Sequence, residues 1–156
     1  MNDLQFIVGL GNTETAALSI IPAPSIKARM IDPGFYIIIR DLNGRRRGYI
    51  LHGPPRAGKP LHVYQTCVEI DYRLRGYAAA AVATLALRAT VANCTEINLR
   101  CAQDLDAIHF WQALGFQFRQ WKVGGRQRKR LIAELYLPLA PVPSGLLRQH
   151  SAVLWR

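Results

Sequence analysis

The chain has 156 residues, half of them hydrophobic, and a formal net charge of +10. This size and apolar content predict a single domain with its own core, and no apolar stretch is long enough to span a membrane. The charge suits an anionic cofactor, a nucleic acid or solubility alone. The N-terminus lacks a secretory signal and the three cysteines form no C-x-x-C pair, so we expect a cytoplasmic protein with free thiols and no metal site.

The first part of the chain gives only weak patterns. Residues 5–12, FIVGLGNT, predict a first strand followed by a turn. Their Gly9-x-Gly11 matches half of a dinucleotide-binding fingerprint, but the third glycine is missing at the required spacing. Residues 12–33 contain three prolines and indicate no clear element.

Residues 34–52 predict a β-hairpin. Two runs rich in β-branched and aromatic residues flank Asn43-Gly44, a dipeptide typical of turns that need positive φ at two positions. The next segment, GPPRAGKP at residues 53–60, imitates a phosphate-binding P-loop. However, Pro60 stands where that motif needs the Ser or Thr that binds magnesium. We therefore expect residues 53–60 to form a hairpin loop.

Residues 61–70, LHVYQTCVEI, predict another strand because they are rich in β-branched and aromatic residues. Strict alternation would place four of its side chains on one face of the sheet: His62, Tyr64, Thr66 and Val68. Cys67 and Glu69 would then lie on the other face. From Ala78 the chain has fifteen residues without Gly or Pro, mostly Ala, Leu, Val and Thr, which predict a helix.

The loop between this strand and this helix has the properties of a phosphate site. The first N–H groups of a helix have no partner within it, and the positive end of the helix dipole adds to their attraction for anions. Arg73 and Arg75 supply positive charge, and Gly76 lets the backbone approach a ligand without a Cβ in between.

The C-terminal half predicts three further elements and a tail. Residues 95–118, TEINLRCAQDLDAIHFWQALGFQF, predict a strand, a short helix and the start of another strand. Residues 119–137 predict a second hairpin around Gly124-Gly125. The tail, residues 138–156, is rich in proline and then in apolar residues. We expect it to pack on the domain formed by residues 1–137 or on a second subunit, which would make the protein a homodimer.

Two blocks of the sequence resemble the GNAT acetyltransferase superfamily. The order Arg-x-x-Gly-x-Ala at residues 73–78, between a strand and a helix, resembles the family's pyrophosphate loop, Gln or Arg-x-x-Gly-x-Gly or Ala. Residues 104–116 are similar to its second signature, Asn-x-x-Ala-x-x-Phe-Tyr-x-x-x-Gly-Phe. The blocks have the family's order and separation, and together they cover residues 61–137, roughly half of the chain.

The resemblance implies an α/β (α+β) fold with a mixed, mostly antiparallel sheet, splayed between two parallel strands and flanked by helices. The parallel strands would be residues 61–70 and 95–101, and acetyl-CoA would lie between them as the cosubstrate. Residues 12–33 would form helices or a loop that shapes the acceptor site. Backbone groups of Cys67, Val68 and Ile70 would pair with the pantetheine arm. The pyrophosphate would be held by the amides of one run: Arg73, Leu74, Arg75, Gly76, Tyr77 and Ala78.

The family position of a catalytic base is occupied by His62, eleven residues before Arg73. An imidazole titrates near neutral pH and can take the proton that an ammonium must lose before it attacks a thioester. Glu69 is the alternative base, although a carboxylate here could equally pair with a nearby arginine. Tyr64 would line the acceptor pocket, or belong to the core.

Two positions depart from the family pattern, although both are still expected to contact the cofactor. Trp111 replaces the Tyr that usually acts as the acid, and an indole N–H is too weak an acid to protonate a thiolate. Asp104 replaces the Asn. The thiolate could leave unaided or through water, another group such as Tyr77 could replace the acid, or the protein could bind CoA without efficient turnover. Cys101, near the expected sulfur, is interpreted as a small buried hydrophobic residue.

Two functions follow from the sequence. The first is an N-acetyltransferase that acts on a primary amine, either a small molecule, a peptide or protein amine, or an aminoacyl-tRNA. The second is a CoA-binding or regulatory module whose basic surface contacts nucleic acid or a protein. The basic residues gather at residues 45–47 and 126–130, and solvated turns also collect charge. No contact with a membrane is expected.

Overall fold

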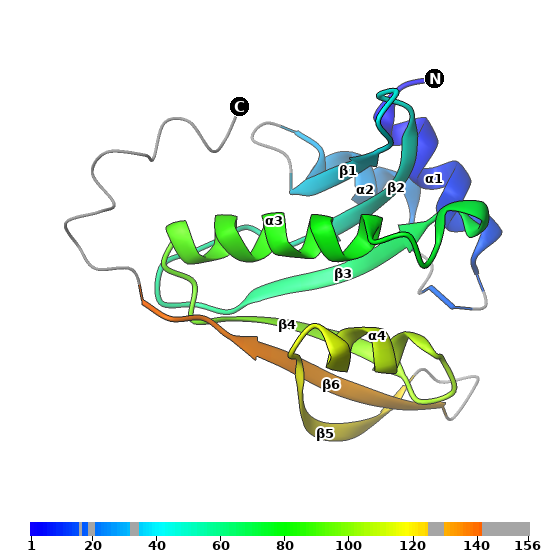
Figure 1. Cartoon of the computed structure of the whole chain (residues 1–156). Helices are drawn as coiled ribbons and strands as arrows, with labels where there is room; N and C mark the ends of the chain where they lie inside the picture. The colour runs from blue at the N-terminus through cyan, green and yellow to red at the C-terminus, as the bar shows by residue number, and fades with distance from the viewer. Residues whose placement is uncertain (16, 19–20, 32–34, 125–129, 142–156) are drawn as a thin grey trace.

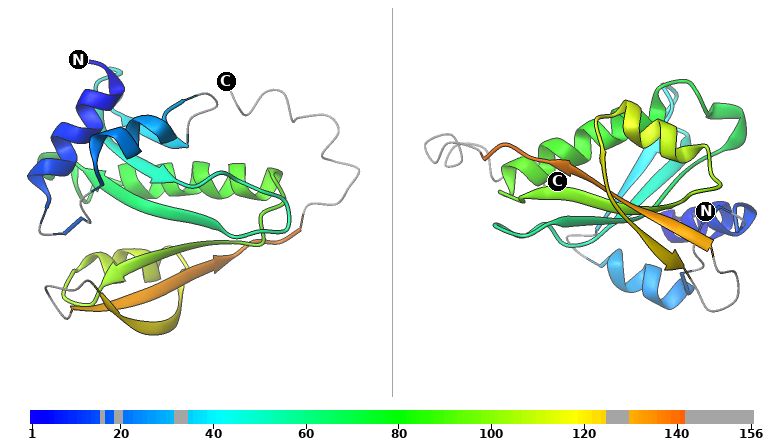
Figure 2. Two further views of the ribbon diagram at one scale, coloured as in Figure 1. Left: turned by 180° about the vertical axis from the view of Figure 1, so that it is seen from behind. Right: turned by 90° about the horizontal axis from the view of Figure 1, so that it is seen from below.

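The computed structural model describes residues 1–15, 17–18, 21–31, 35–124 and 130–141 (Figure 1). One six-stranded sheet in the order β1-β2-β3-β4-β6-β5 forms its centre. The two figures show α1 and α2 on one face of the sheet and α3 and α4 on the other (Figures 1 and 2). The elements are α1 (Asp3–Thr13), α2 (Ala23–Arg29), β1 (Tyr36–Arg40), β2 (Arg46–His52), β3 (Leu61–Val68), a short 3₁₀ helix (Ile70–Tyr72), α3 (Tyr77–Val91), β4 (Glu96–Ala102), α4 (Ala107–Ala113), β5 (Gln117–Gly124) and β6 (Arg130–Pro138).

The N-terminal segment is a helix, so the strand predicted at residues 5–12 is wrong. A capping box starts α1: the Asn2 side chain accepts a hydrogen bond from the Gln5 backbone N–H, and the Gln5 side chain accepts one from the Asn2 N–H. This reciprocal pair satisfies two N–H groups that would otherwise lack a partner. Phe6 and Ile7 are buried against the sheet. Gly11 allows the helix to approach Tyr49, whose hydroxyl would lie 2.9 Å from an added Cβ.

Both predicted hairpins are confirmed. β1 and β2 pair antiparallel, and Gly44 at their turn has a φ of +75°, whereas Asn43 does not have the positive φ that the dipeptide predicts. The Asp41 carboxylate accepts hydrogen bonds from the N–H groups of Asn43 and Arg45, which fixes this turn. β2 and β3 also pair antiparallel, so residues 53–60 form a hairpin loop as predicted. β5 and β6 form the second hairpin, whose turn lies outside the described residues.

The core has two parts, one on each face of the sheet. The larger part lies under α3 and α4 and includes Leu85, Ile97 and Leu135, all almost completely buried. The smaller part lies under α1 and α2 and includes Ile7 and Tyr49. None of the helices within the described ranges is long and apolar enough to cross a membrane.

A β-bulge in β3 changes which side chains share a face. Gln65 lies opposite Leu51 of β2, but the next pair joins Val63 to His52, so Tyr64 is the extra residue. Val63 and Val68 consequently both belong to the core under α3, although they are five positions apart and regular alternation would place them on opposite faces.

The predicted alternation along β3 is therefore wrong beyond Tyr64. Cys67 belongs to the core under α1 and α2, which is the face on which Tyr64 meets Arg29 of α2 and the ring of His62. Thr66 is the partner of Ile50, a residue of the opposite core. His62, Tyr64 and Cys67 thus share one face, while Thr66 and Val68 lie on the other.

The chain after β6 is described only as far as residue 141. The Leu139 N–H donates a hydrogen bond to the Thr95 carbonyl, which holds the chain beside the start of β4. The tail whose packing was predicted begins at residue 138, and its residues 142–156 lie outside the described residues.

His52 is a buried histidine at the end of β2, 1% exposed. Its Nδ1 lies 2.8 Å from the Gly53 carbonyl oxygen, which can only accept, so Nδ1 carries the hydrogen. Within the described residues, its Nε2 has no hydrogen-bond partner. Burial lowers the pKa of His52, because the imidazolium form would lose its hydration.

Gly48→Ala should destabilise the protein by about 1–3 kcal/mol, the usual cost of an atom that does not fit. An added Cβ at residue 48 of β2 would lie 2.4 Å from the Cys67 carbonyl oxygen of the neighbouring strand. Denaturant unfolding measures the change. Gly9→Ala on α1 is the control, since its Cβ meets no atom within 4 Å, and it should be neutral or stabilising. Equal stability of the two variants would contradict the strand packing.

The free energy of unfolding should fall as the pH is lowered below about 6.5, the pKa of an unperturbed histidine, and His52 should be one cause. Its pKa is lower in the folded state, so the unfolded chain binds the proton first and is stabilised as the pH falls. Unfolding curves at several pH values should show a smaller loss for His52→Gln than for the wild type. His109→Gln, at an exposed position, should keep the wild-type dependence. An identical dependence in His52→Gln would refute the assignment.

Candidate functional site

The two parallel strands at the centre of the sheet pair over a short distance only. β3 and β4 are joined at three positions, Leu61 with Ile97, His62 with Asn98 and Val63 with Leu99. Beyond them, β3 continues to pair with β2, and β4 continues to pair with β6. The facing backbone edges of residues 64–68 and 100–102 therefore have no ladder between them. This is the splayed arrangement that the family resemblance implies for residues 61–70 and 95–101.

The loop after β3 has an unusual backbone. Leu74 and Gly76 have φ values of +60° and +82°, and Gly76 is the N-cap residue of α3. Backbone turns of this handedness point successive N–H groups to one side and bind anions. Among the described residues, nothing accepts a hydrogen bond from the N–H groups of residues 74–79, and the first N–H bonded within α3 is that of Ala80. The loop thus offers several free donors at a helix N-terminus.

Arg73 holds this loop in place. Its Nε donates to the Val68 carbonyl at 2.9 Å, and its Nη2 donates to the Glu14 carboxylate at 2.6 Å. The side chain thus ties the loop to the end of β3 and to the segment that follows α1. Arg75 lies with its guanidinium 5.4 Å from the ring centroid of Tyr72 and is exposed. Unlike Arg73, it forms no ion pair with any described residue.

The other predicted loop residues lie around this backbone. Ile70 is exposed at the start of the 3₁₀ helix, and Cys67 is buried at the end of β3, where burial raises its pKa to about 11. The Tyr77 ring lies 6.1 Å from that of Tyr72. Ala78 follows in the first turn of α3.

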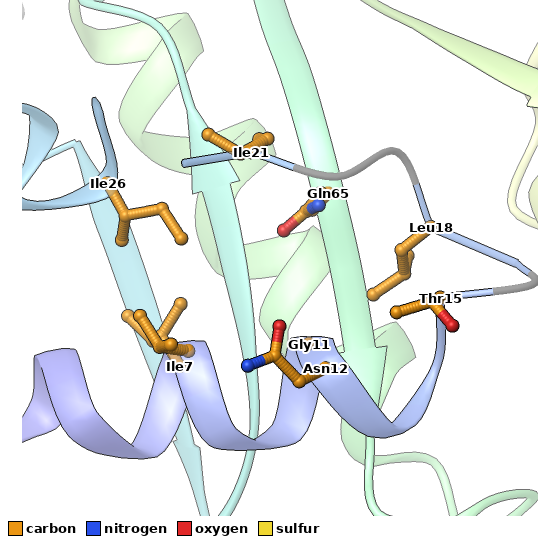
Figure 3. A pocket seen from close by; sticks show the side chains of 9 residues that line it. Ile7, Gly11, Asn12, Thr15, Leu18, Ile21, Ile26 and Gln65 are labelled. Carbon is orange, nitrogen blue, oxygen red and sulfur yellow. The ribbon is translucent and has the colours of Figure 1, made fainter. Parts of the chain in front are cut away.

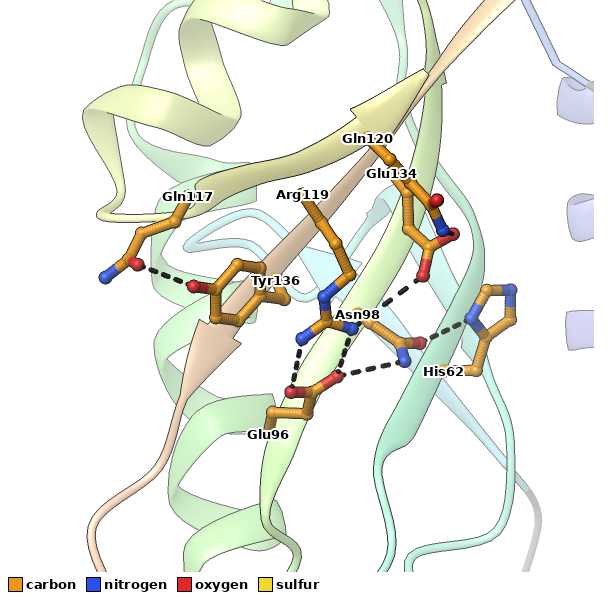
Figure 4. A network of polar contacts seen from close by, with 8 residues as sticks. All are labelled: His62, Glu96, Asn98, Gln117, Arg119, Gln120, Glu134 and Tyr136. Carbon is orange, nitrogen blue, oxygen red and sulfur yellow. Dashed lines mark hydrogen bonds and ion pairs between the residues drawn. The ribbon is translucent and has the colours of Figure 1, made fainter. Parts of the chain in front are cut away.

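His62 is paired with Asn98 at the middle position of the three that join β3 and β4, one residue before the strands separate. Its Nδ1 is 2.6 Å from Oδ1 of Asn98 (Figure 4). Its ring makes an edge-to-face contact with Tyr64, with centroids 4.9 Å apart. The guanidinium of Arg29 lies 4.2 Å from the centroid of the Tyr64 ring. The structure therefore brings His62 and Tyr64 together, on the side of the sheet that carries α1 and α2.

Glu69 lies apart from this group. Its carboxylate accepts a hydrogen bond from Nη1 of Arg47 at 3.0 Å, and Arg47 also pairs with Asp41. The second candidate base is thus engaged in an ion pair beyond the end of β3.

A polar network extends from His62 across the sheet (Figure 4). Asn98 donates from Nδ2 to Glu96 at 3.3 Å, and Arg119 donates to both carboxylate oxygens of Glu96, at 2.9 and 2.8 Å. The hydrogen bonds from Arg119 lower the pKa of Glu96. These residues were missed by sequence reasoning. The alternation of Glu96 and Asn98 with buried residues of β4 would have placed them on one face, but not beside His62.

A small cavity lies on the same side of the sheet, between α1, the segment after it and β3 (Figure 3). Its volume is about 30 Å³, which is room for one or two water molecules and too little for an acyl acceptor. Gln65 reaches it from β3 and also accepts a hydrogen bond from the Tyr49 hydroxyl. The cavity is lined by Ile7, Val8, Gly11, Asn12, Thr15, Leu18, Ile21, Ile26 and Gln65.

The basic residues of the first hairpin are largely paired. Arg46 forms an ion pair with Asp3, and Arg47 pairs with Asp41 and Glu69. Of the second basic cluster, residues 126–129 lie outside the described residues. In the described part of the chain, no group of three His, Cys, Asp or Glu side chains is arranged to hold a metal ion.

A comparison of the sequence with models of protein families identifies the family of this chain. The family model described as "Acetyltransferase (GNAT) family" matches residues 12–116, more than half of the chain. The chain belongs to the GNAT acetyltransferase family. The resemblance found in the sequence is therefore confirmed, together with the fold that it implies. No curated protein sequence matches the chain.

Solved GNAT structures share this fold at low sequence identity. Ard1 from Thermoplasma volcanium is 14% identical with a TM-score of 0.76, over 88% of this chain and 92% of that chain. A structure of the NatC complex bound to Gag peptide and CoA is 21% identical with a TM-score of 0.73, over 89% and 93%. An aminoglycoside 6'-N-acetyltransferase complexed with coenzyme A is 14% identical with a TM-score of 0.73, over 90% and 92%.

The two positions that depart from the GNAT pattern have structural partners. Trp111 is only 6% exposed and packs its ring against Phe110 and Phe116, with centroids 5.0 and 5.1 Å away. It is part of the core of this GNAT domain. Asp104 accepts a hydrogen bond from Nε of Arg130 at 2.6 Å. Cys101 is buried, which raises its pKa to about 11 and agrees with its interpretation as a hydrophobic residue.

Proposed function

We propose that this chain is an N-acetyltransferase that transfers an acetyl group from acetyl-CoA to a primary amine, which attacks directly in a ternary complex. The observation that carries the proposal is the loop of residues 73–78. It combines free backbone N–H groups, two positive φ values and the start of α3, and it follows the part of β3 that no longer pairs with β4. These features suit the pyrophosphate of CoA.

The cofactor residues follow from this placement. The amides of residues 74–78 and the side chain of Arg75 would hold the pyrophosphate, while Arg73 keeps the loop in shape. Backbone groups of Cys67, Val68 and Ile70 would lie along the pantetheine arm. The bound cosubstrate supplies an acetyl group activated as a thioester. The CoA complexes of NatC and of the aminoglycoside acetyltransferase support this use of the fold.

His62 is the proposed general base. A primary amine is mostly an ammonium ion at neutral pH and has no lone pair until a proton is removed. The imidazole lies one residue before the end of the β3–β4 ladder, next to Tyr64, which we propose as a wall of the acceptor site. Glu69 is not proposed as the base, because its carboxylate is paired with Arg47.

The leaving thiolate is proposed to depart without the usual tyrosine. Trp111 packs in the core and its indole N–H is a poor acid. A thiol has a pKa of about 8.5, so its thiolate is a fair leaving group near neutral pH and can take its proton from water. Acceptors of three kinds remain within the proposal: small-molecule amines, peptide or protein amines, and aminoacyl-tRNA.

Gly76→Glu should abolish binding of acetyl-CoA in calorimetric titration, because it adds a negative charge where the phosphates would bind. Gly58→Glu is a matched control. Both glycines have positive φ and open space around an added Cβ, but Gly58 hydrogen-bonds to Asn93, just beyond the opposite end of α3. The wild type and Gly58→Glu should bind alike. Absence of binding to the wild type would refute the proposed function.

His62→Ala should lower kcat by about 10²- to 10⁴-fold, the usual contribution of a general base, and leave the dissociation constant of acetyl-CoA unchanged. Steady-state acetylation of the best amine from a mixed panel, together with calorimetry, measures both quantities. His109→Ala, on the exposed side of α4, serves as the control. A wild-type kcat in His62→Ala would assign the proton transfer to another group or to water.

A further inference from the structure

The contact between His62 and Asn98 decides which nitrogen of the imidazole carries the hydrogen. Nδ1 of His62 lies 2.6 Å from Oδ1 of Asn98, and an amide oxygen can only accept a hydrogen bond. Nδ1 must therefore be the donor. In the neutral ring, Nε2 then keeps its lone pair and is the nitrogen that can accept a proton.

The orientation of the Asn98 amide is itself fixed by a charge. Its Nδ2 donates to the Glu96 carboxylate at 3.3 Å. A flipped amide would turn its oxygen toward that carboxylate and lose the hydrogen bond. Glu96 is held by Arg119 through two parallel hydrogen bonds, the strong geometry for this pair. The guanidinium of Arg119 also lies 4.1 Å from the centroid of the Tyr136 ring. This contact helps to hold Arg119, the residue of the network that binds Glu96, in place.

The backbone explains why these residues meet. His62 and Asn98 are partners in the three-position parallel ladder between β3 and β4, so their side chains lie next to each other on one face. Asn98 is in turn the ladder partner of Tyr136 on β6, and Glu96 lies two residues earlier on the same face. The network therefore crosses from β3 to β5 where the sheet is continuous, below the point at which β3 and β4 separate (Figure 4).

We propose that Asn98 is a positioning residue that holds His62 in the Nδ1–H tautomer, with Glu96 and Arg119 fixing the direction of its amide. Its role in the reaction rests on the proposed function. When the amine loses its proton, the N–H bond of the ammonium breaks and a bond from Nε2 to that hydrogen forms. The imidazolium keeps its Nδ1–H donating to Asn98 Oδ1, so the contact serves both protonation states. Serine proteases orient their histidine in a comparable way, through an Nδ1–H that donates to an aspartate.

The first test is the tautomer, which needs neither cofactor nor acceptor. Long-range ¹H–¹⁵N correlation spectra of the full chain, at a pH where His62 is neutral, should show a protonated Nδ1 in the wild type. Asn98→Ala should shift His62 toward the Nε2–H form. Asn98→Asp keeps an acceptor oxygen at this place and should preserve the Nδ1–H form. Gln120→Ala is the control, since this amide hydrogen-bonds to Glu134 on the same sheet and should leave His62 unchanged.

The second test is turnover. Asn98→Ala should lower kcat between ~10-fold and ~10⁴-fold, the upper value being the cost of a wrongly protonated histidine in a serine protease. The dissociation constant of acetyl-CoA should stay at the wild-type value, which also reports correct folding. Asn98→Asp should recover part of the lost kcat.

The outcomes separate this inference from the proposed function. A wild-type His62 in the Nε2–H form overturns the inference even if the protein is an active acetyltransferase. Unchanged tautomer and kcat in Asn98→Ala overturn it as well. A tautomer that depends on Asn98 in a protein that binds no acetyl-CoA and acetylates no amine would overturn the role in the reaction together with the proposed function.

Discussion

The short parallel ladder between β3 and β4 is the constraint on which the candidate site depends. Three paired positions join the two halves of the sheet, and beyond them the strands follow different neighbours. The short ladder determines where the strand edges become unpaired and where His62 lies. It leaves unpaired backbone edges that lead toward the loop at residues 73–78, and it holds His62 beside Asn98. A longer ladder would close the opening, and a shorter one would leave the two halves of the sheet without a common register.

The bulge at Tyr64 adds a second geometric condition. The extra residue shifts the alternation of side chains along the rest of β3 by one position. Cys67 therefore packs under α1 and α2, while Val68 packs under α3. His62 and Tyr64 share a face by ordinary alternation, and the bulge brings Cys67 to their side and Val68 to the opposite one. Sheets commonly use a bulge to redirect side chains next to a site. Arg73 then fastens the end of the strand through the Val68 carbonyl.

Local signals predicted most of the fold, and contacts between distant segments account for what they missed. The hairpin at Asn43-Gly44 and the loop before α3 follow from residues that fix their own backbone. The helix α1 was missed because Gly9 and Gly11 suggested a turn, whereas the capping pair Asn2 and Gln5 was the stronger signal. Alternation failed at Tyr64 because a bulge depends on the partner strand. Asn98 was missed since no local pattern states which residue of β4 lies beside His62.

The loop at residues 73–78 holds one residue whose backbone is strained and one whose backbone is not. Leu74 has a φ of +60°, which costs an L-residue other than glycine about 1–3 kcal/mol. Gly76 adopts +82° freely. The conformation persists because Arg73 anchors it at two points, to Val68 and to Glu14. The loop is thus preorganised: its backbone donors are aligned before any anion arrives, and a ligand does not have to supply the free energy of ordering them.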